Sequence, residues 1–211
     1  MHFKYYKSER LILFIIALAL LLGFIVTAYI HPLIEHLNEP FHSIILYTEM
    51  FTVPFFMTII FFYIDKRGWK NNLFKWLVDI PNLSGRYEGK IISSYLIDGK
   101  NVEISFAVEI VQTSSSIHIS SYYLNPELSE YTSSYSVIEQ IEKQKNGAFK
   151  LYYLYSNMPG KLNTILTQHD GTAYATYLAD IKQLDGGYYN SRRNTGEFKA
   201  NWVNKELLHR Y

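Results

Sequence analysis

The sequence predicts a membrane-anchored all-β protein, in which an N-terminal hairpin of two transmembrane helices precedes a small antiparallel β-barrel of about eight strands. Two long apolar runs lie within the first 64 of the 211 residues. The rest of the chain alternates polar and apolar residues with the period of strands, and turn sequences divide it at hairpin spacing. The 19 Tyr and 13 Phe residues suit both a β-rich fold and a membrane protein.

The hairpin is predicted at residues 1–64. Residues 11–30 contain no charge, and about twenty helical residues cross a hydrocarbon core of roughly 30 Å. Residues 44–64 form a second apolar run, and the polar segment between the two runs contains Pro32 and Pro40. A cleaved signal peptide is the alternative interpretation of the first run, which is longer than the apolar core of about 7 to 15 residues usual in such peptides.

The positive residues predict the orientation of this hairpin. Lysines and arginines precede the first run and follow the second, whereas the connecting loop contains Glu35 and Glu39 but no Lys or Arg. Because positive flanks stay on the cytoplasmic side, we expect both termini in the cytoplasm.

Several residues within the hairpin suggest more than an anchor. Ala19, Gly23 and Thr27 recur every four residues, a spacing that lets helix backbones approach closely, either between protomers or within one hairpin. Glu49 is an intramembrane carboxylate, which indicates either a function or a side chain that reaches the nearby interface. Pro54 is expected to kink the second helix.

The cytoplasmic part divides into a linker and a barrel. Residues 65–80 form a basic, Trp-containing linker expected at the headgroup surface. Residues 81–211 form the predicted ligand-binding barrel, whose closure removes exposed strand edges. Within residues 102–112, apolar residues at even positions face polar Glu103, Ser105 and Glu109, as in a half-buried strand. The expected strands are 85–94, 102–112, 116–123, 131–143, 148–156, 171–179, 187–190 and 197–203, with a turn expected at 185–187.

Composition and motifs exclude several functions. A net charge of +1 is too balanced for coating duplex nucleic acid, and the absence of cysteine excludes disulfides and thiolate metal sites. No nucleophile elbow, phosphate-binding loop or zinc-spaced pair is present, so no catalytic residue and no metal site are predicted and the chain is not expected to be an enzyme. His31, His36 and His42 are interpreted as exposed loop residues.

Binding chemistry is concentrated in the predicted turns of the barrel. Arg192 and Arg193 lie beside Tyr188 and Tyr189, and planar guanidinium donors next to aromatic faces suit a ligand that carries phosphates and bases. Residues 114–116 and 155–157 add hydroxyls and amides. The alternatives are a solvated turn for the arginines, a strand-end turn for the serines and barrel core for Tyr155.

Five segments carry a resemblance to a known family. They are residues 82–89 (NLSGRYEG), 108–116 (VEIVQTSSS), 155–159 (YSNMP), 168–173 (QHDGTA) and 184–198 (LDGGYYNSRRNTGEF). In this order, after two apolar helices, they resemble the two-transmembrane, β-strand-rich effectors that accompany cyclic-oligonucleotide synthases in bacterial CBASS anti-phage systems.

The resemblance implies a function and a set of ligand contacts. The barrel would bind a cyclic dinucleotide, with no other cofactor, and the chain would then form a homo-oligomer that disrupts the bacterial inner membrane and kills the infected cell. The implied nucleotide contacts are Arg192, Arg193, Thr195, Tyr155, Asn157, Gln112 and His169. The membrane effector residues, predicted from their spacing and charge and not from the resemblance, are Ala19, Gly23, Thr27 and Glu49. The alternative function is a membrane-tethered, lipocalin-like module that binds a lipid or a protein partner.

Overall fold

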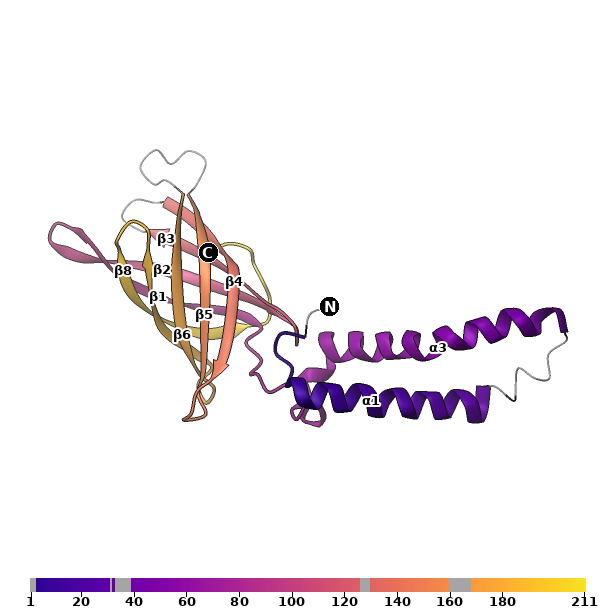
Figure 1. Ribbon diagram of the computed structural model, residues 1–211. Coiled ribbons are helices and arrows are strands. Elements are labelled where there is room, and N and C mark those ends of the chain that lie inside the picture. Colours follow the sequence, from indigo (N-terminus) through magenta and orange to yellow (C-terminus); the bar gives the residue numbers. More distant parts are fainter. Residues whose placement is uncertain (1–2, 31, 33–38, 126–129, 160–167) are drawn as a thin grey trace. The chain divides into compact units, whose positions relative to one another are not determined.

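The computed structural model describes residues 3–30, 32, 39–125, 130–159 and 168–211 (Figure 1). The chain forms two compact units. The first contains Met1–Asp79 together with Thr113–Ser115, and the second contains Ile80–Gln112 with Ser116–Tyr211. The second unit thus begins at Ile80.

The first unit is helical. Helix α1 (Ser8–Ile25) continues into a π-helical turn, η1 (Val26–Ile30), and helix α3 spans Glu39–Lys66. Two 3₁₀ turns follow, η2 (Gly68–Lys70) and η3 (Asn72–Phe74). They lie in the predicted basic linker.

One helical stretch in the described part of the chain, Ser8–Ile30, has the length and apolar character of a membrane span, and an 18-residue window within it has a mean hydropathy of 3.0. The predicted second run lies in α3, but the described residues of α3 do not add a second span. The side chains described in α3 are those of residues 51–66, a stretch shorter than the roughly 18 residues that a span needs. A membrane hairpin of two spans is therefore not shown, and the side chain of Glu49 lies outside the described residues.

Buried polar contacts join segments of the helical unit that are distant in sequence. Tyr6 forms a β-bridge with Val78. The Ser114 hydroxyl lies 2.8 Å from the Tyr6 hydroxyl and donates to Asp65 Oδ1 at 2.8 Å, while the Ser114 amide donates to the Asp65 carbonyl at 3.1 Å. These bonds explain why residues 113–115 group with the helices.

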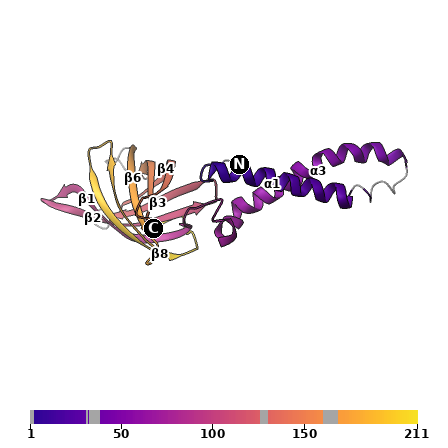
Figure 2. The same ribbon diagram turned by 60° about the horizontal axis from the view of Figure 1, so that its bottom comes forward.

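The second unit is a closed antiparallel barrel with strand order β1 to β8, which confirms the predicted architecture (Figure 1, Figure 2). Each strand pairs with its neighbour in sequence, and β1 pairs with β8 from Arg86↔Asn204 to Ser93↔Gly196. The strands are β1 (Gly85–Ile97), β2 (Lys100–Gln112), β3 (Ile117–Asn125), β4 (Glu130–Lys143), β5 (Phe149–Pro159), β6 (His169–Leu178), β7 (Gln183–Asn190) and β8 (Thr195–Asn204).

The prediction of a turn at residues 185–187 is wrong. These residues lie inside β7, and the turn between β6 and β7 is at residues 179–182. Gly186 serves close strand packing instead, because a Cβ there would lie 1.9 Å from the Tyr174 carbonyl oxygen of β6. Glycine in a strand marks a close backbone approach as often as it marks a turn.

The interior of the barrel has two layers. We call the end that carries the connections after β1, β3, β5 and β7 the mouth, and the opposite end the base. Large apolar side chains fill the base half, and those exposed by 2% or less include Tyr87, Ile110, Ile119, Leu151 and Leu184. Toward the mouth, buried hydroxyl and amide side chains, among them Ser93, Ser134 and Asn157, lie together with apolar ones such as Val102.

Candidate functional site

The antiparallel order of the strands brings predicted ligand contacts from distant segments of the chain to the mouth. The end of β5 pairs with the start of β6 through Tyr155↔Gly171 and Asn157↔His169. The end of β7 joins the same edge through Gly171↔Asn190, and residues 191–194 form the turn into β8. Of the seven predicted nucleotide contacts, the structure collects these six at the mouth: Tyr155, Asn157, His169, Arg192, Arg193 and Thr195.

Four tyrosines inside the mouth half each bond a small polar side chain. We call these eight residues the tyrosine cluster. The pairs are Tyr123 with Ser134 at 2.9 Å, Tyr188 with Ser93 at 3.0 Å, Tyr153 with Ser121, and Tyr155 with Asn190. Buried hydroxyls need such partners, and here the partners come from other strands of the ring.

Two glycines make room for the tyrosine rings. A Cβ at Gly171 would lie 2.4 Å from the ring carbon Cζ and the hydroxyl of Tyr155, and a Cβ at Gly196 would lie 2.5 Å from a ring carbon of Tyr188. Both distances are far shorter than a van der Waals contact. The rings therefore lie against the barrel wall at positions where no other residue fits.

Burial keeps the tyrosine cluster uncharged. Desolvation raises the pKa of Tyr123, Tyr153, Tyr155 and Tyr188, because the phenolate form would lose its hydration inside the barrel. The charge that a neighbouring phenolate would carry raises the pKa of Tyr123, Tyr153 and Tyr155 further. The cluster is thus a set of neutral hydroxyls that can both donate and accept hydrogen bonds.

Asn190 connects the tyrosine cluster to the arginine turn. Its Oδ1 accepts hydrogen bonds from the amides of Arg192 and Asn194, both at 3.1 Å, and its carbonyl accepts from the Arg193 amide at 3.0 Å. The same side chain bonds the hydroxyl of Tyr155. Asn190 was not among the predicted contacts, although an Asn that opens a turn is a known signal for such side-chain bonds.

The arginine turn presents its polar groups at the surface. Arg193 is exposed, with a positive φ of 64°, and Arg192 is half-buried. Thr195 is exposed, and its amide donates to the Ser94 hydroxyl at 2.9 Å, which ties the turn to β1. Two guanidinium groups therefore stand at the rim beside the neutral cluster.

Gln112, the seventh predicted contact, lies at the base. Its Oε1 accepts from the Leu83 amide at 2.7 Å and its Nε2 donates to the Pro81 carbonyl at 2.9 Å. The side chain is buried and fixes the entry of the chain into β1. The structure does not bring Gln112 together with the other six residues, and the predicted Ser114 and Ser115 belong to the helical unit.

This arrangement has a defined chemical capacity. Neutral hydroxyls and tyrosine faces suit an uncharged heterocycle, and adjacent guanidinium groups suit an anion. Within the described ranges, no group of three or more His, Asp or Glu residues is arranged to hold a metal ion. Of the predicted loop histidines, His31 and His36 and the side chain of His42 lie outside the described residues.

Comparisons with known proteins agree with the resemblance noted in the sequence. The family model for the Cap15 cyclic dinucleotide receptor domain matches residues 78–201. A protein of Yersinia aleksiciae named CD-NTase-associated protein 15 is 30% identical over 128 residues, which are 61% of this chain and 57% of that protein. The matched region therefore spans little more than half of the relative.

The tyrosine cluster predicts alkaline destabilisation. In the unfolded chain these tyrosines ionise near pH 10, whereas burial raises their pKa in the barrel. Above pH 10 the unfolded state therefore loses protons first, and the free energy of unfolding should fall by up to about 1.4 kcal/mol per pH unit for each such tyrosine. Urea unfolding between pH 8 and 11, followed beside absorbance at 295 nm, measures this. Constant stability over that range, with all tyrosines ionising in the folded protein, would contradict the cluster.

Proposed function

The chain belongs to the Cap15 cyclic dinucleotide receptor family, and on that premise we propose that its barrel binds a cyclic dinucleotide at the mouth. The chain acts as a receptor and catalyses no reaction. The observation that carries the proposal is the Asn190 side chain, which holds the arginine turn and the tyrosine cluster together at one end of the barrel.

The arginine turn accounts for the phosphates of the ligand. A cyclic dinucleotide carries two negative phosphodiesters, and guanidinium groups recognise phosphate oxygens through paired hydrogen bonds. Arg192 and Arg193 lie on consecutive positions of a turn whose backbone is fixed by Asn190. Fixing the turn before the ligand arrives lowers the entropic cost of binding.

The tyrosine cluster accounts for the bases. Nucleobases stack on aromatic faces, and their edges need donors and acceptors of the kind that hydroxyls and amides supply. Asn157, itself buried, lies beside His169 at the same rim. A lipid-binding barrel would instead need an apolar interior at its mouth, so these polar residues favour the nucleotide over the lipocalin-like alternative.

Membrane disruption is the second part of the proposal. The Ser8–Ile30 stretch crosses the inner membrane, α3 crosses beside it, and both termini remain in the cytoplasm. Ligand binding favours a homo-oligomer. This requires that the ligand binds the assembled state more tightly than the separate protomers, since a ligand shifts an equilibrium only by its difference in affinity for the two states. Glu49 and the small residues Ala19, Gly23 and Thr27 act within that oligomer, and the damaged membrane kills the infected cell.

Substitution of the arginines tests the ligand site. Arg192→Ala or Arg193→Ala should weaken binding by about 1.5 to 3 kcal/mol, the range for a hydrogen bond to a charged group. Calorimetry of the detergent-solubilised chain against a panel of cyclic dinucleotides measures the change. Lys145→Ala is the matched control, because it removes an exposed cation from the turn at the base. Unchanged affinity in both single mutants and the double mutant would show that this turn does not bind the phosphates of the ligand.

Substitution of Gly23 tests the membrane step. No described atom lies within 4 Å of a Cβ built at Gly23, so a larger side chain meets no obstacle there within one chain. Gly23→Leu should therefore leave ligand affinity unchanged while it blocks close packing between protomers and reduces toxicity in cells that make the ligand. Leu21→Ile, at an exposed position of α1, is the control. Equal killing by Gly23→Leu at equal membrane levels would show that packing through this face is not the effector step.

A further inference from the structure

Two charged residues are buried on the outer wall of the barrel. Arg86 of β1 and Glu109 of β2 lie directly opposite each other in the strand register, and each side chain is 2% exposed. Their strand neighbours Tyr87 and Val108 are inward, so these two side chains point outward. The alternating pattern of β2 predicts Glu109 on the polar face of the strand, but it does not predict that this side chain is buried.

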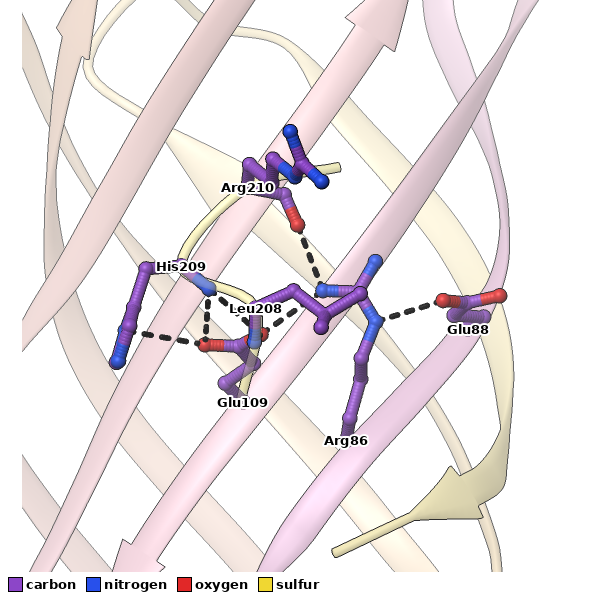
Figure 3. A network of polar contacts seen from close by, with 6 residues as sticks. All are labelled: Arg86, Glu88, Glu109, Leu208, His209 and Arg210. Atoms are coloured by element: carbon purple, nitrogen blue, oxygen red, sulfur yellow. Dashed lines mark hydrogen bonds and ion pairs between the residues drawn. The ribbon is translucent and has the colours of Figure 1, made fainter. Parts of the chain in front are cut away.

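The segment that follows β8 covers this pair, and Figure 3 shows the contacts. Glu109 Oε1 accepts hydrogen bonds from the amides of Leu208 at 2.7 Å and His209 at 3.1 Å, and Oε2 accepts from the His209 amide at 3.2 Å. Arg86 Nη1 donates to the Arg210 carbonyl at 2.6 Å and to Glu109 Oε1 at 2.8 Å. We call residues 205–211 the strap.

The strap is recognised through its main chain. Two successive amides surround the carboxylate, and His209 has a positive φ of 55°, an arrangement typical of the backbone nests that bind anions. Of the side chains, Leu208 is 42% exposed, and the His209 ring is 74% exposed although its Nδ1 lies 3.5 Å from Glu109 Oε2, so the shortest contacts are those of the main chain. The buried carboxylate thus accepts hydrogen bonds from two successive backbone amides, and the buried guanidinium donates to the carbonyl of the residue that follows them.

The ion pair between Arg86 and Glu109 does not depend on the strap. Arg86 keeps its hydrogen bonds to Glu109 at 2.8 Å and to Glu88 at 2.6 Å, so no unpaired charge is left in the wall. The strap lies beyond residues 78–201, which the family model matches. Its departure therefore costs its own bonds and not those of the barrel.

From these contacts we infer that the outer wall of β1 and β2 carries a docking site for a peptide main chain, which the strap occupies reversibly. The site lies on the other face of the wall from the tyrosine cluster and does not depend on the proposed ligand.

A peptide supplied in trans tests the site. A chain truncated after Asn204 is solubilised in detergent and titrated with a fluorescent peptide that has the sequence of residues 205–211. We expect saturable binding, weakened at least tenfold by Glu109→Gln in the protein or by N-methylation of the amide that corresponds to His209. Failure of the folded, truncated chain to bind the peptide, or equal binding of the N-methylated peptide, would overturn the inference.

Hydrogen exchange of the intact chain tests the same inference without truncation. The amides of Leu208 and His209 should exchange at least tenfold more slowly than in an unstructured peptide, yet at least tenfold faster than the paired amides of β2. Glu109→Gln should accelerate the exchange of these two amides selectively. Exchange of the strap amides only together with the strands would show that the strap is an inseparable part of the barrel.

Discussion

The pairing of β1 with β8 is the constraint on which the rest of the barrel depends. These strands are more than one hundred residues apart in sequence, and their eight paired positions from Arg86↔Asn204 to Ser93↔Gly196 convert an open meander into a ring. A ring has no exposed strand edges, and it gives every inward side chain a partner from another strand. The bond between Tyr188 of β7 and Ser93 of β1 exists only because the ring is closed.

Closure also explains why the two ends of the barrel differ. The base half is filled by apolar side chains and stabilises the fold, whereas the mouth half carries paired hydroxyls whose exchange for ligand contacts disturbs little of the core. Asn190 lies at the point where this polar layer meets a turn that bears two arginines. The proposed ligand site therefore has a rigid wall below it and a fixed turn beside it, as preorganised recognition requires.

The sequence predicted the parts of this fold that depend on local pattern. Strand alternation and turn residues led to a barrel of about eight strands, and the arginine turn was recognised from its composition. Long-range effects could not be predicted. Gly186 resembled a turn residue because the close approach of Tyr174 is visible only in the sheet. Gln112 was implied as a ligand contact by the family resemblance, but it ends β2 at the base and bonds the Leu83 amide there. The burial of Glu109 depends on a strap one hundred residues away.

Site-specific NMR of the tyrosines tests most directly whether the ligand binds at the mouth. With ring-labelled tyrosine in the detergent-solubilised chain, a saturating cyclic dinucleotide should shift the resonances of Tyr155 and Tyr188 in the cluster. Those of Tyr87 and Tyr177, which are buried toward the base, should stay unchanged. Shifts confined to Tyr87 and Tyr177, with no change at Tyr155 and Tyr188, would contradict a binding site at the mouth.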